Sequence, residues 1–475
     1  MDTDNQLLKK ARDFAEVSLA DRTRKSGEKI LDHCLRVAEN LQKFKVTDPT
    51  TIATALLHHS LSEGAATSED IEKEFGSDIK SMISAFESLR ILRVKAGQKE
   101  EFIENLRKMF LVLARDLRVV LIKLSDILDN LTTMKYLEPD KQLEVAQETL
   151  DIFAPLAERL GMSEMRGDLQ DLAFPYLYPV EYQELMQTTK SYLPNLEKKM
   201  LQIKAKILSL LKSQGIEGDI QNRVKHNYSL FIKLQRPDIK GDIKNVSDLI
   251  AIRIITKNEQ DCYEVLDILQ KNFRLFPIPI RDHIAHPKSN GYRSIHLNLY
   301  GSNHLPFEIQ IRTKDMHEAA EYGLAAHWNY ADQKKKGVSD EEISLGFAGG
   351  AKKLDWVRSL SEWQDEIKNN QEFLKTVKTD FFGERIFCFT PKGDVKDLPS
   401  GATPIDFGYK VHTDLGGRVM GAKVNGRMVP LDHKLKNGDL VDLVVNKDSK
   451  KLPNRDWLKF VVTTLARKKI KRVYQ

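Results

Sequence analysis

Residues 248–256 read DLIAIRIIT and decide the fold of the middle of the chain. This nearly continuous apolar run, rich in β-branched residues, is typical of a strand that is buried on both faces of a sheet. Asp248 is expected at the start of this strand and Arg253 at its end. Two later runs, SIHLNLYG (294–301) and FEIQIRT (307–313), also have strand character, so we predict a domain that combines strands with helices.

Helical patterns precede this region and short strands follow it. Residues 1–195 carry apolar residues at spacings of three and four, which predicts an all-α domain. Asp48 or Thr50 is the expected N-cap of one of its helices. A helix at residues 196–214 (LEKKMLQIKAKILSLLKSQ) leads into the strands. Beyond residue 379, turns such as NGR and KNGD predict the hairpins of a small β-rich domain.

Length and composition narrow the class of protein. A chain of 475 residues is too long for one core, so about three domains of roughly 100–200 residues are expected. Its 41% hydrophobic and 30% charged residues are typical of a globular protein. No apolar run predicts a membrane span, and the N-terminus lacks a signal-peptide pattern. Three cysteines without paired spacing suggest neither a disulfide framework nor a zinc site formed by cysteines, so we expect a cytoplasmic protein.

The net charge of +6 is concentrated at the C-terminal end of the sequence. Residues 447–475 contain ten Lys or Arg and two Asp, a net charge of +8, which leaves −2 for the remainder. Such a basic segment either contacts RNA or another polyanion, with release of counterions, or is the solvated end of a helix. Charge alone does not separate the two interpretations.

Charged and polar side chains flank the predicted buried strand. Lys225, Ser229 and Lys233 share one face if their segment is helical, and cations there suit phosphate oxygens. Glu308, Gln310 and Arg312 share a strand face by alternation, while Ile309 and Ile311 point into the core. The candidate site residues are Arg223, Lys225, Ser229, Lys233, Asp248, Arg253, Lys288, Asn290, Tyr292, His296, Glu308, Gln310 and Arg312.

This set suits phosphoryl-type transfer, which requires neutralisation of charge on the moving group and in-line positioning. Asp248 and Glu308 offer two carboxylates for Mg²⁺, and one of them can accept a proton from an attacking hydroxyl. Tyr292 offers a ring for stacking on a base. Each residue alone has a plainer interpretation, as a strand cap, a solvated charge or a packing aromatic. The charged face beside a very apolar strand is what favours a site.

Five motifs resemble, in the same order, those of the synthetase domain of the RelA/SpoT homologue family of long-form alarmone synthetases. They are RVKHNYSLFIKLQ, DLIAIRII, PKSNGYRSIH, EIQIRT and MHEAAEYGLAAHWNY. The likeness spans nearly the whole chain and implies an α+β multidomain protein. The implied domains are an all-α HD-type domain, a mixed α/β nucleotidyltransferase-like synthetase domain and a small β-grasp TGS domain. The implied boundaries are 1–195 for the HD-type domain, 196–345 for the synthetase domain, 346–379 for a linker helix, 380–447 for the TGS domain and 448–475 for the basic tail.

The family transfers pyrophosphate from ATP to the ribose 3′-hydroxyl of GDP or GTP in the stringent response, so the resemblance implies a GTP/GDP diphosphokinase. It implies that Asp248 and Glu308 handle Mg²⁺ and the hydroxyl proton. Before the PKSNGY run, Pro279 stands where the family's basic variant has an arginine, which leaves the preference between GDP and GTP open. The resemblance places ATP at Arg223, Lys225, Ser229, Lys233 and Arg253, and GDP or GTP at Lys288, Asn290, Tyr292, His296, Gln310 and Arg312.

The N-terminal domain resembles the family's hydrolase but departs from its metal site. His33, His58 and Asp126 match the family's Mn²⁺ ligands, whereas His59 replaces an aspartate and Ser62 replaces a glutamate. Imidazole at 59 favours softer metals, and Ser62 cannot act as a base near neutral pH. We therefore expect an inactive, regulatory hydrolase domain, with Mn²⁺ in doubt. The set of His33, His58, His59 and Asp126 nevertheless offers four metal ligands.

The TGS-like segment implies contact with tRNA on the ribosome through His412, although this residue is equally interpretable as a buried strand histidine. Two rival functions stay open: a bifunctional enzyme that also hydrolyses ppGpp, and a non-catalytic module that binds the ribosome or tRNA. No membrane partner is expected. The oligomeric state, and whether the natural chain continues into the family's further C-terminal domains, are also left open.

Overall fold

The computed structural model describes residues 2–90, 106–107, 109–110, 112, 115–287, 291–301, 305–323, 385–446, 448 and 452–474. The chain divides into two compact units, one of residues 1–98 and 108–354 and the other of residues 99–107 and 355–475. Within the described ranges, no helix is both long enough and apolar enough to cross a membrane. The expected linker helix at 346–379 lies outside the described residues.

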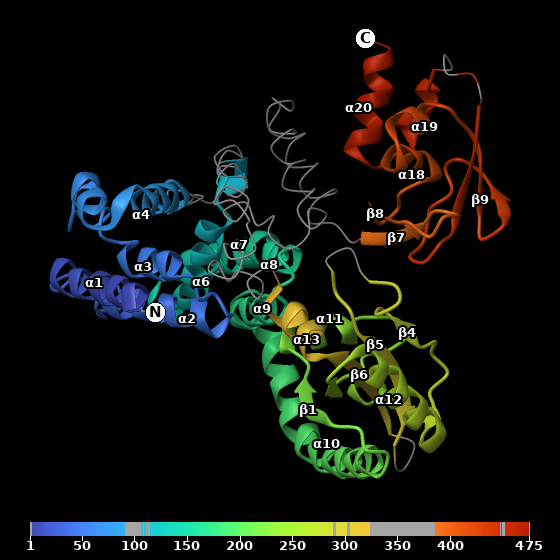
Figure 1. The fold of residues 1–475 in the computed structure, drawn as a ribbon, viewed down its shortest axis with the longest axis horizontal. Coiled ribbons are helices and arrows are strands. Elements are labelled where there is room, and N and C mark those ends of the chain that lie inside the picture. Colours follow the sequence, from blue (N-terminus) through green and yellow to red (C-terminus); the bar gives the residue numbers. More distant parts are fainter. Residues whose placement is uncertain are drawn as a thin grey trace. The chain divides into compact units, whose positions relative to one another are not determined.

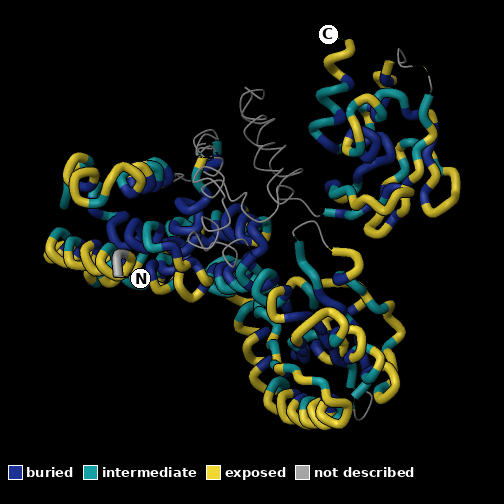
Figure 2. Tube along the Cα trace, viewed as in Figure 1, coloured by how far each residue is buried: buried dark blue, intermediate teal, exposed yellow. Residues whose placement is uncertain are grey.

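The N-terminal part of the first unit is helical, as predicted (Figure 1). Asp48 accepts a hydrogen bond from the Thr51 N–H, so Asp48 and not Thr50 is the N-cap of α3. Helix α6 is almost wholly buried among its neighbours (Figure 2). The helices are α1 (Asp2–Ser18), α2 (Ile30–Lys43), α3 (Pro49–Leu57), α4 (Ser68–Arg90), α6 (Leu117–Thr132), η1 (Met134–Tyr136), α7 (Pro139–Glu148), η2 (Thr149–Phe153), α8 (Ala154–Arg159) and α9 (Ser163–Leu177).

A long helix, α10 (Pro179–Ser213), connects the helical part to the sheet. The predicted domain boundary at residue 195 falls inside this continuous helix. Met200, Ile207 and Leu211 in its second half are buried in the core that the sheet shares. The outward face of the same half is exposed (Figure 2). The sheet is therefore built directly against the helix that leads into it.

The sheet of the first unit has β2 near its centre, parallel to β6 and antiparallel to β1. β2 starts two residues after Asp248 and continues past Arg253, so the prediction that Arg253 ends this strand is wrong. The strand order is β1-β2-β6-β5-β3, with β4 beside β5. The elements are β1 (Gly218–Val224), α11 (Asn227–Leu234), η3 (Ile243–Asn245), β2 (Ile250–Thr256), α12 (Glu259–Asn272), β3 (Arg274–Leu275), β4 (Arg281–Asp282), β5 (Ile295–Tyr300), β6 (Pro306–Thr313) and α13 (Lys314–Tyr322).

The second unit is small and rich in strands, as predicted. Asn425 and Gly426 have φ angles of 51° and 80°, the left-handed values that a tight β9–β10 hairpin turn requires. Its elements are β7 (Arg385–Phe389), β8 (Val395–Pro399), α18 (Pro404–Val411), α19 (Thr413–Gly417), β9 (Val419–Val424), β10 (Arg427–Val429), β11 (Val441–Val445), η7 (Arg455–Lys459) and α20 (Thr464–Val473).

The basic C-terminal segment is folded onto this small unit. Trp457, Ala466 and Ile470 are buried in one cluster with Ile405 and Tyr409 of α18. One face of α20 therefore belongs to the core of this unit, so the basic segment is not solvated along its whole length. Lys471 and Arg472 at its last turn are exposed.

Candidate functional site

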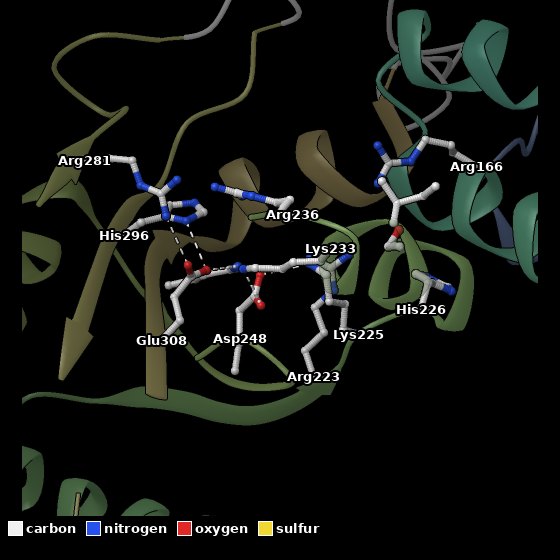
Figure 3. Close-up of a pocket in the computed structure, with 14 residues that line it drawn as sticks. Arg166, Arg223, Lys225, His226, Lys233, Arg236, Asp248, Arg281, His296 and Glu308 are labelled. Atoms are coloured by element: carbon white, nitrogen blue, oxygen red, sulfur yellow. Dashed lines mark hydrogen bonds and ion pairs between the residues drawn. The ribbon is translucent and has the colours of Figure 1, made fainter. Parts of the chain in front are cut away.

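A cavity of about 410 Å³ collects most of the residues that the sequence singled out (Figure 3). It lies over β1, α11, the start of β2 and β6, so chain segments far apart in sequence contribute to it. Its lining is formed by Arg166, Arg223, Lys225, His226, Ser229, Ile232, Lys233, Arg236, Asp248, Ala251, Arg281, His296, Glu308 and Gln310.

Asp248 is held between two lysines. Its Oδ2 lies 2.9 Å from Lys225 Nζ and its Oδ1 lies 2.7 Å from Lys233 Nζ. Burial alone would raise the pKa of Asp248, but the two ammonium groups outweigh it and hold this pKa below its usual value. Lys225 precedes α11 and does not belong to it, yet it reaches the same cavity as Ser229 and Lys233.

Glu308 on β6 accepts contacts from three side chains. Arg281 Nη2 lies 3.1 Å from its Oε2, while His296 Nδ1 lies 3.2 Å and Gln310 Nε2 lies 2.9 Å from its Oε1. Burial would raise the Glu308 pKa, but His296, Gln310 and Arg281 lower it to about 2. The carboxylate is therefore ionised throughout the physiological range.

The two carboxylate residues are neighbours across the sheet. The Glu308 N–H donates to the carbonyl oxygen of Ser247, next to Asp248, at 3.0 Å. Both side chains point toward the same space in Figure 3. Two ionised carboxylates that share one cavity form an oxygen donor set that fits a hard divalent metal ion.

Tyr292 and His296 form a connected pair beside Glu308. The Tyr292 hydroxyl lies 2.7 Å from His296 Nε2, and the other ring nitrogen of His296 faces Glu308. Tyr292 is half-buried, and burial raises its pKa. Lys288 and Asn290, which precede this pair, lie outside the described residues.

Arg253 and Arg312 do not line the cavity. Both pair with Glu321 of α13, at 2.8 Å and 2.7 Å, and all three side chains are buried. Arg312 also contacts His317 Nδ1 at 2.9 Å. In this arrangement the two arginines fasten α13 to β2 and β6, so their predicted roles in nucleotide binding stay predictions.

Several cavity residues were not predicted from the sequence. His226 lies between Lys225 and Ser229, and Arg236 follows Lys233 by three residues. Arg281 was considered only for its bearing on the choice between GDP and GTP. Those three lie close to motifs that sequence reasoning had already singled out. Arg166 also lines the cavity, but it lies near none of these motifs, because it belongs to α9 in the helical region.

The second cluster of candidate residues lies in the helical part. Ligand atoms of His33, His58, His59 and Asp126 lie within 4.8 Å of one another. His33 Nδ1 contacts Asp129 Oδ2 at 2.6 Å, and His58 Nδ1 contacts the Ala55 carbonyl oxygen at 2.6 Å. Metal-binding histidines are commonly oriented in this way, by a hydrogen bond from the ring nitrogen that does not bind the metal.

The remaining ring nitrogens favour a metal ion in this cluster. Nε2 of His33 and Nε2 of His58 are buried and make no hydrogen bond within the described part of the chain, although His33 Nε2 lies 3.3 Å from Asp126 Oδ1. Burial lowers the pKa of His58 to about 3, which keeps its imidazole neutral, the form that binds metals. Ser62 donates to the His59 carbonyl oxygen at 3.1 Å and offers no carboxylate.

His412 lies at the surface of the second unit. It sits between α18 and α19, its side chain is 66% exposed, and its Nδ1 accepts from the Asp414 N–H at 3.3 Å. The alternative that it is a buried strand histidine is therefore wrong. An exposed imidazole is available to a partner.

Models of three protein families match the chain. They are the HD domain over residues 11–163, the region found in RelA / SpoT proteins over residues 222–335, and the TGS domain over residues 386–445. The second match contains the cavity residues of the sheet, and the first contains the histidine cluster.

Curated relatives are similar over nearly the whole chain. The GTP pyrophosphokinase of Myxococcus xanthus is 40% identical over 472 residues, 99% of this chain and 60% of that protein. The guanosine-3′,5′-bis(diphosphate) 3′-pyrophosphohydrolase of Aquifex aeolicus is 38% identical, over 98% of this chain and 64% of that protein. The bifunctional (p)ppGpp synthase/hydrolase RelA of Mycobacterium tuberculosis is 37% identical, over 99% of this chain and 62% of that protein. The chain spans about three fifths of the length of these relatives.

Proposed function

Because the chain belongs to the RelA/SpoT family, we propose that it is a (p)ppGpp synthetase, which transfers pyrophosphate from ATP to the 3′-hydroxyl of GDP or GTP. One observation carries this proposal. Asp248 and Glu308, both ionised, lie side by side in a cavity that six arginine and lysine side chains line. Such a cavity neutralises a polyphosphate and positions a metal ion, which is most of what phosphoryl-type transfer requires.

The cations of the cavity bind the ATP phosphates in this proposal. Arg223 at the end of β1 and Ser229 on α11 line the same space as Lys225 and Lys233. The two lysines now pair with Asp248, and a phosphate and a metal ion together replace those contacts. Asp248 and Glu308 would hold Mg²⁺, which would supply charge neutralisation at the transferred group.

The acceptor nucleotide lies at the Glu308 end of the cavity. Tyr292 stacks on the guanine, and its hydroxyl is held by His296, which also contacts Glu308. This chain of contacts connects the position of the base to the carboxylate nearest the attacking hydroxyl. Glu308, with a pKa of about 2, accepts a hydrogen bond from that hydroxyl. Its carboxylate becomes a stronger base only when Arg281 and His296 contact the substrate in place of Glu308.

Replacement of Glu308 tests the proposal. Glu308→Gln removes the charge without changing the shape of the side chain, so synthesis should fall by about a hundredfold or more. Thin-layer separation of products from labelled ATP, with GDP and with GTP, measures the rate and the acceptor preference together.

A matched control is Glu259→Gln. Glu259 pairs with Arg293 on the surface of the same region and does not line the cavity, so this variant should keep the wild-type rate. The proposal fails if wild-type protein makes no product, or if Glu308→Gln and Glu259→Gln are equally active.

We further propose that the histidine cluster holds a divalent metal ion but does not hydrolyse ppGpp. His33, His58, His59 and Asp126 would be the ligands, and the bound ion would stabilise the helical part. Three imidazoles and one carboxylate suit Zn²⁺ better than Mn²⁺. Neither Ser62 nor His59 reproduces the carboxylates that the family's hydrolases use.

The second unit supports a proposal of contact with tRNA on the ribosome. His412 is exposed, and α20 adds a basic surface to the same small unit. Anisotropy of labelled deacylated tRNA with the full chain tests this, and His412→Ala should weaken binding by about tenfold, the size of a lost base contact. His433→Ala, which changes another histidine of this unit, should bind like wild type. Equal affinities for all three proteins would argue against the proposal.

A further inference from the structure

We infer that helix α9 of the N-terminal helical part completes the nucleotide cavity: Arg166 contacts the ATP phosphates, and the contact of α9 with His226 positions α11. This inference rests on the proposed synthetase function. None of the motifs around the sheet includes α9, whose last residue lies 49 residues before His226. Four contacts carry the argument.

The first contact is a close approach of α9 to His226. Gly167 lies against the imidazole so closely that an added Cβ would be 2.2 Å from His226 Nε2 and 2.3 Å from its Cδ2. Only glycine lets the ring occupy this position without displacement. The histidine, which begins the segment carrying the cavity lysines and serine, is therefore located by a helix of the other domain.

The second contact is a cap supplied from α9. Asp171 Oδ1 accepts from the Tyr228 N–H at 2.9 Å, and its Oδ2 accepts from the Asn227 N–H at 3.2 Å. The same Oδ2 lies 3.0 Å from His226 Nδ1. The first backbone N–H groups of α11 thus find their partner on α9 and not within their own segment, which fixes the start of α11.

The third contact continues along the same face of α9. The Phe174 ring stacks on Phe231 of α11 with centroids 4.9 Å apart and meets Tyr228 edge-on at 5.5 Å. Positions 167, 171 and 174 are spaced by four and three residues, so they share one helix face. Because Ser229 and Lys233 project from α11, this face determines where two phosphate-binding groups lie.

The fourth contact places Arg166 in the cavity itself. Arg166 lines it, and Glu158 of α8 pairs with the guanidinium and restrains it. Figure 3 shows Arg166 entering from the helical part at the end of the cavity where His226 lies, away from Arg281 and Glu308. That end is the proposed ATP side. A guanidinium offers paired donors to phosphate oxygens, so Arg166 adds a bidentate phosphate contact there.

Steady-state kinetics of the full chain test the role of Arg166. Arg166→Ala should raise KM for ATP about tenfold, the effect of losing one charged hydrogen bond, while KM for GDP and kcat change less than about twofold. Arg166→Lys should recover part of the loss. Arg12→Ala removes another arginine that pairs with a glutamate, at 2.9 Å on α1, and should leave all constants unchanged.

Gly167→Ala tests the positioning role without replacing Arg166 or any other residue that lines the cavity. Its methyl group displaces the His226 ring, so KM for ATP should rise while KM for GDP stays unchanged. If Arg166→Ala and Gly167→Ala both make product with the wild-type KM for ATP, the inference is wrong and the proposed function stands. If KM for both substrates and kcat all change in proportion to a fall in melting temperature, α9 has only a structural role and the inference is also wrong. A wild-type protein that makes no product refutes the proposed function itself.

Discussion

His59 gives the N-terminal cluster a third imidazole where the resemblance leads one to expect a carboxylate. The cluster keeps the geometry of a metal site, since Asp129 and the Ala55 carbonyl oxygen orient the rings of His33 and His58. What changes is the charge and hardness of the ligand set. In the proposed arrangement, two side chains, His59 and Ser62, separate metal binding from the hydrolysis that a hard metal and a nearby carboxylate support.

A metal analysis and a hydrolysis assay check this separation together. Purified protein should carry close to one Zn²⁺, His58→Ala should lose it, and neither should release pyrophosphate from ppGpp with Mn²⁺ or Zn²⁺. His286→Ala, a change of histidine outside the cluster, should keep the metal. Pyrophosphate release by wild-type protein would show that the site is a working hydrolase.

At the scale of elements, α11 depends on α9 for its start, and this dependence has a pH signature. The His226 side chain faces Asp171 at 3.0 Å and Glu164 at 3.8 Å, and Asp168 lies within the same group. Burial lowers the pKa of His226, but the carboxylates of Asp171 and Glu164 outweigh it and raise the pKa to about 9. A raised pKa means that the protonated ring stabilises the folded state.

The sign of the pH dependence follows from linkage. The stabilisation by His226 should be complete below pH ~6.5, the pKa of an unperturbed histidine, and should disappear as the pH rises through about 9. Its size is on the order of 3 kcal/mol at most. Melting temperatures of wild type and His226→Gln from pH 6 to 10 measure it, and the two curves should converge at the alkaline end. A difference that is constant with pH would contradict this assignment.

At the scale of the whole molecule, each compact unit is held together by contacts between distant segments. In the second unit, Asp406 is fully buried and accepts hydrogen bonds from the N–H groups of Thr403, Val462 and Thr463. Its carboxylate joins α18 to the segment that leads into α20. The basic C-terminal helix is therefore a part of the small domain and not an appendage.

Asp406→Ala should destabilise this second unit by about 2–4 kcal/mol, because several buried donors lose their acceptor together. Urea unfolding of the full chain, followed by tryptophan fluorescence to which Trp457 of that cluster contributes, reports the change. Asp432→Ala removes an exposed aspartate from the same unit and should shift the midpoint little. Equal midpoints for both variants would mean that Asp406 does not hold α20.

Much of the fold and site follows from local sequence. The apolar run 250–256 specifies a central strand, and Asn425-Gly426 specifies a hairpin turn whatever surrounds it. Alternation along β6 predicts one face for Glu308, Gln310 and Arg312, and the structure places the first two in the cavity, whereas Arg312 pairs with Glu321. These features were predictable because neighbours in the chain determine them.

Contacts between distant segments were decided only by the tertiary structure. The chain by itself determined a buried strand, two carboxylates and a set of cations around them, because strand periodicity and residue chemistry are local properties. It did not show that Arg166 reaches the same cavity, that Arg253 and Arg312 share Glu321, or that α20 packs on α18. Each of these depends on which faces pack together, and the free energy that selects those faces is spread over whole buried surfaces and is not encoded in any short motif.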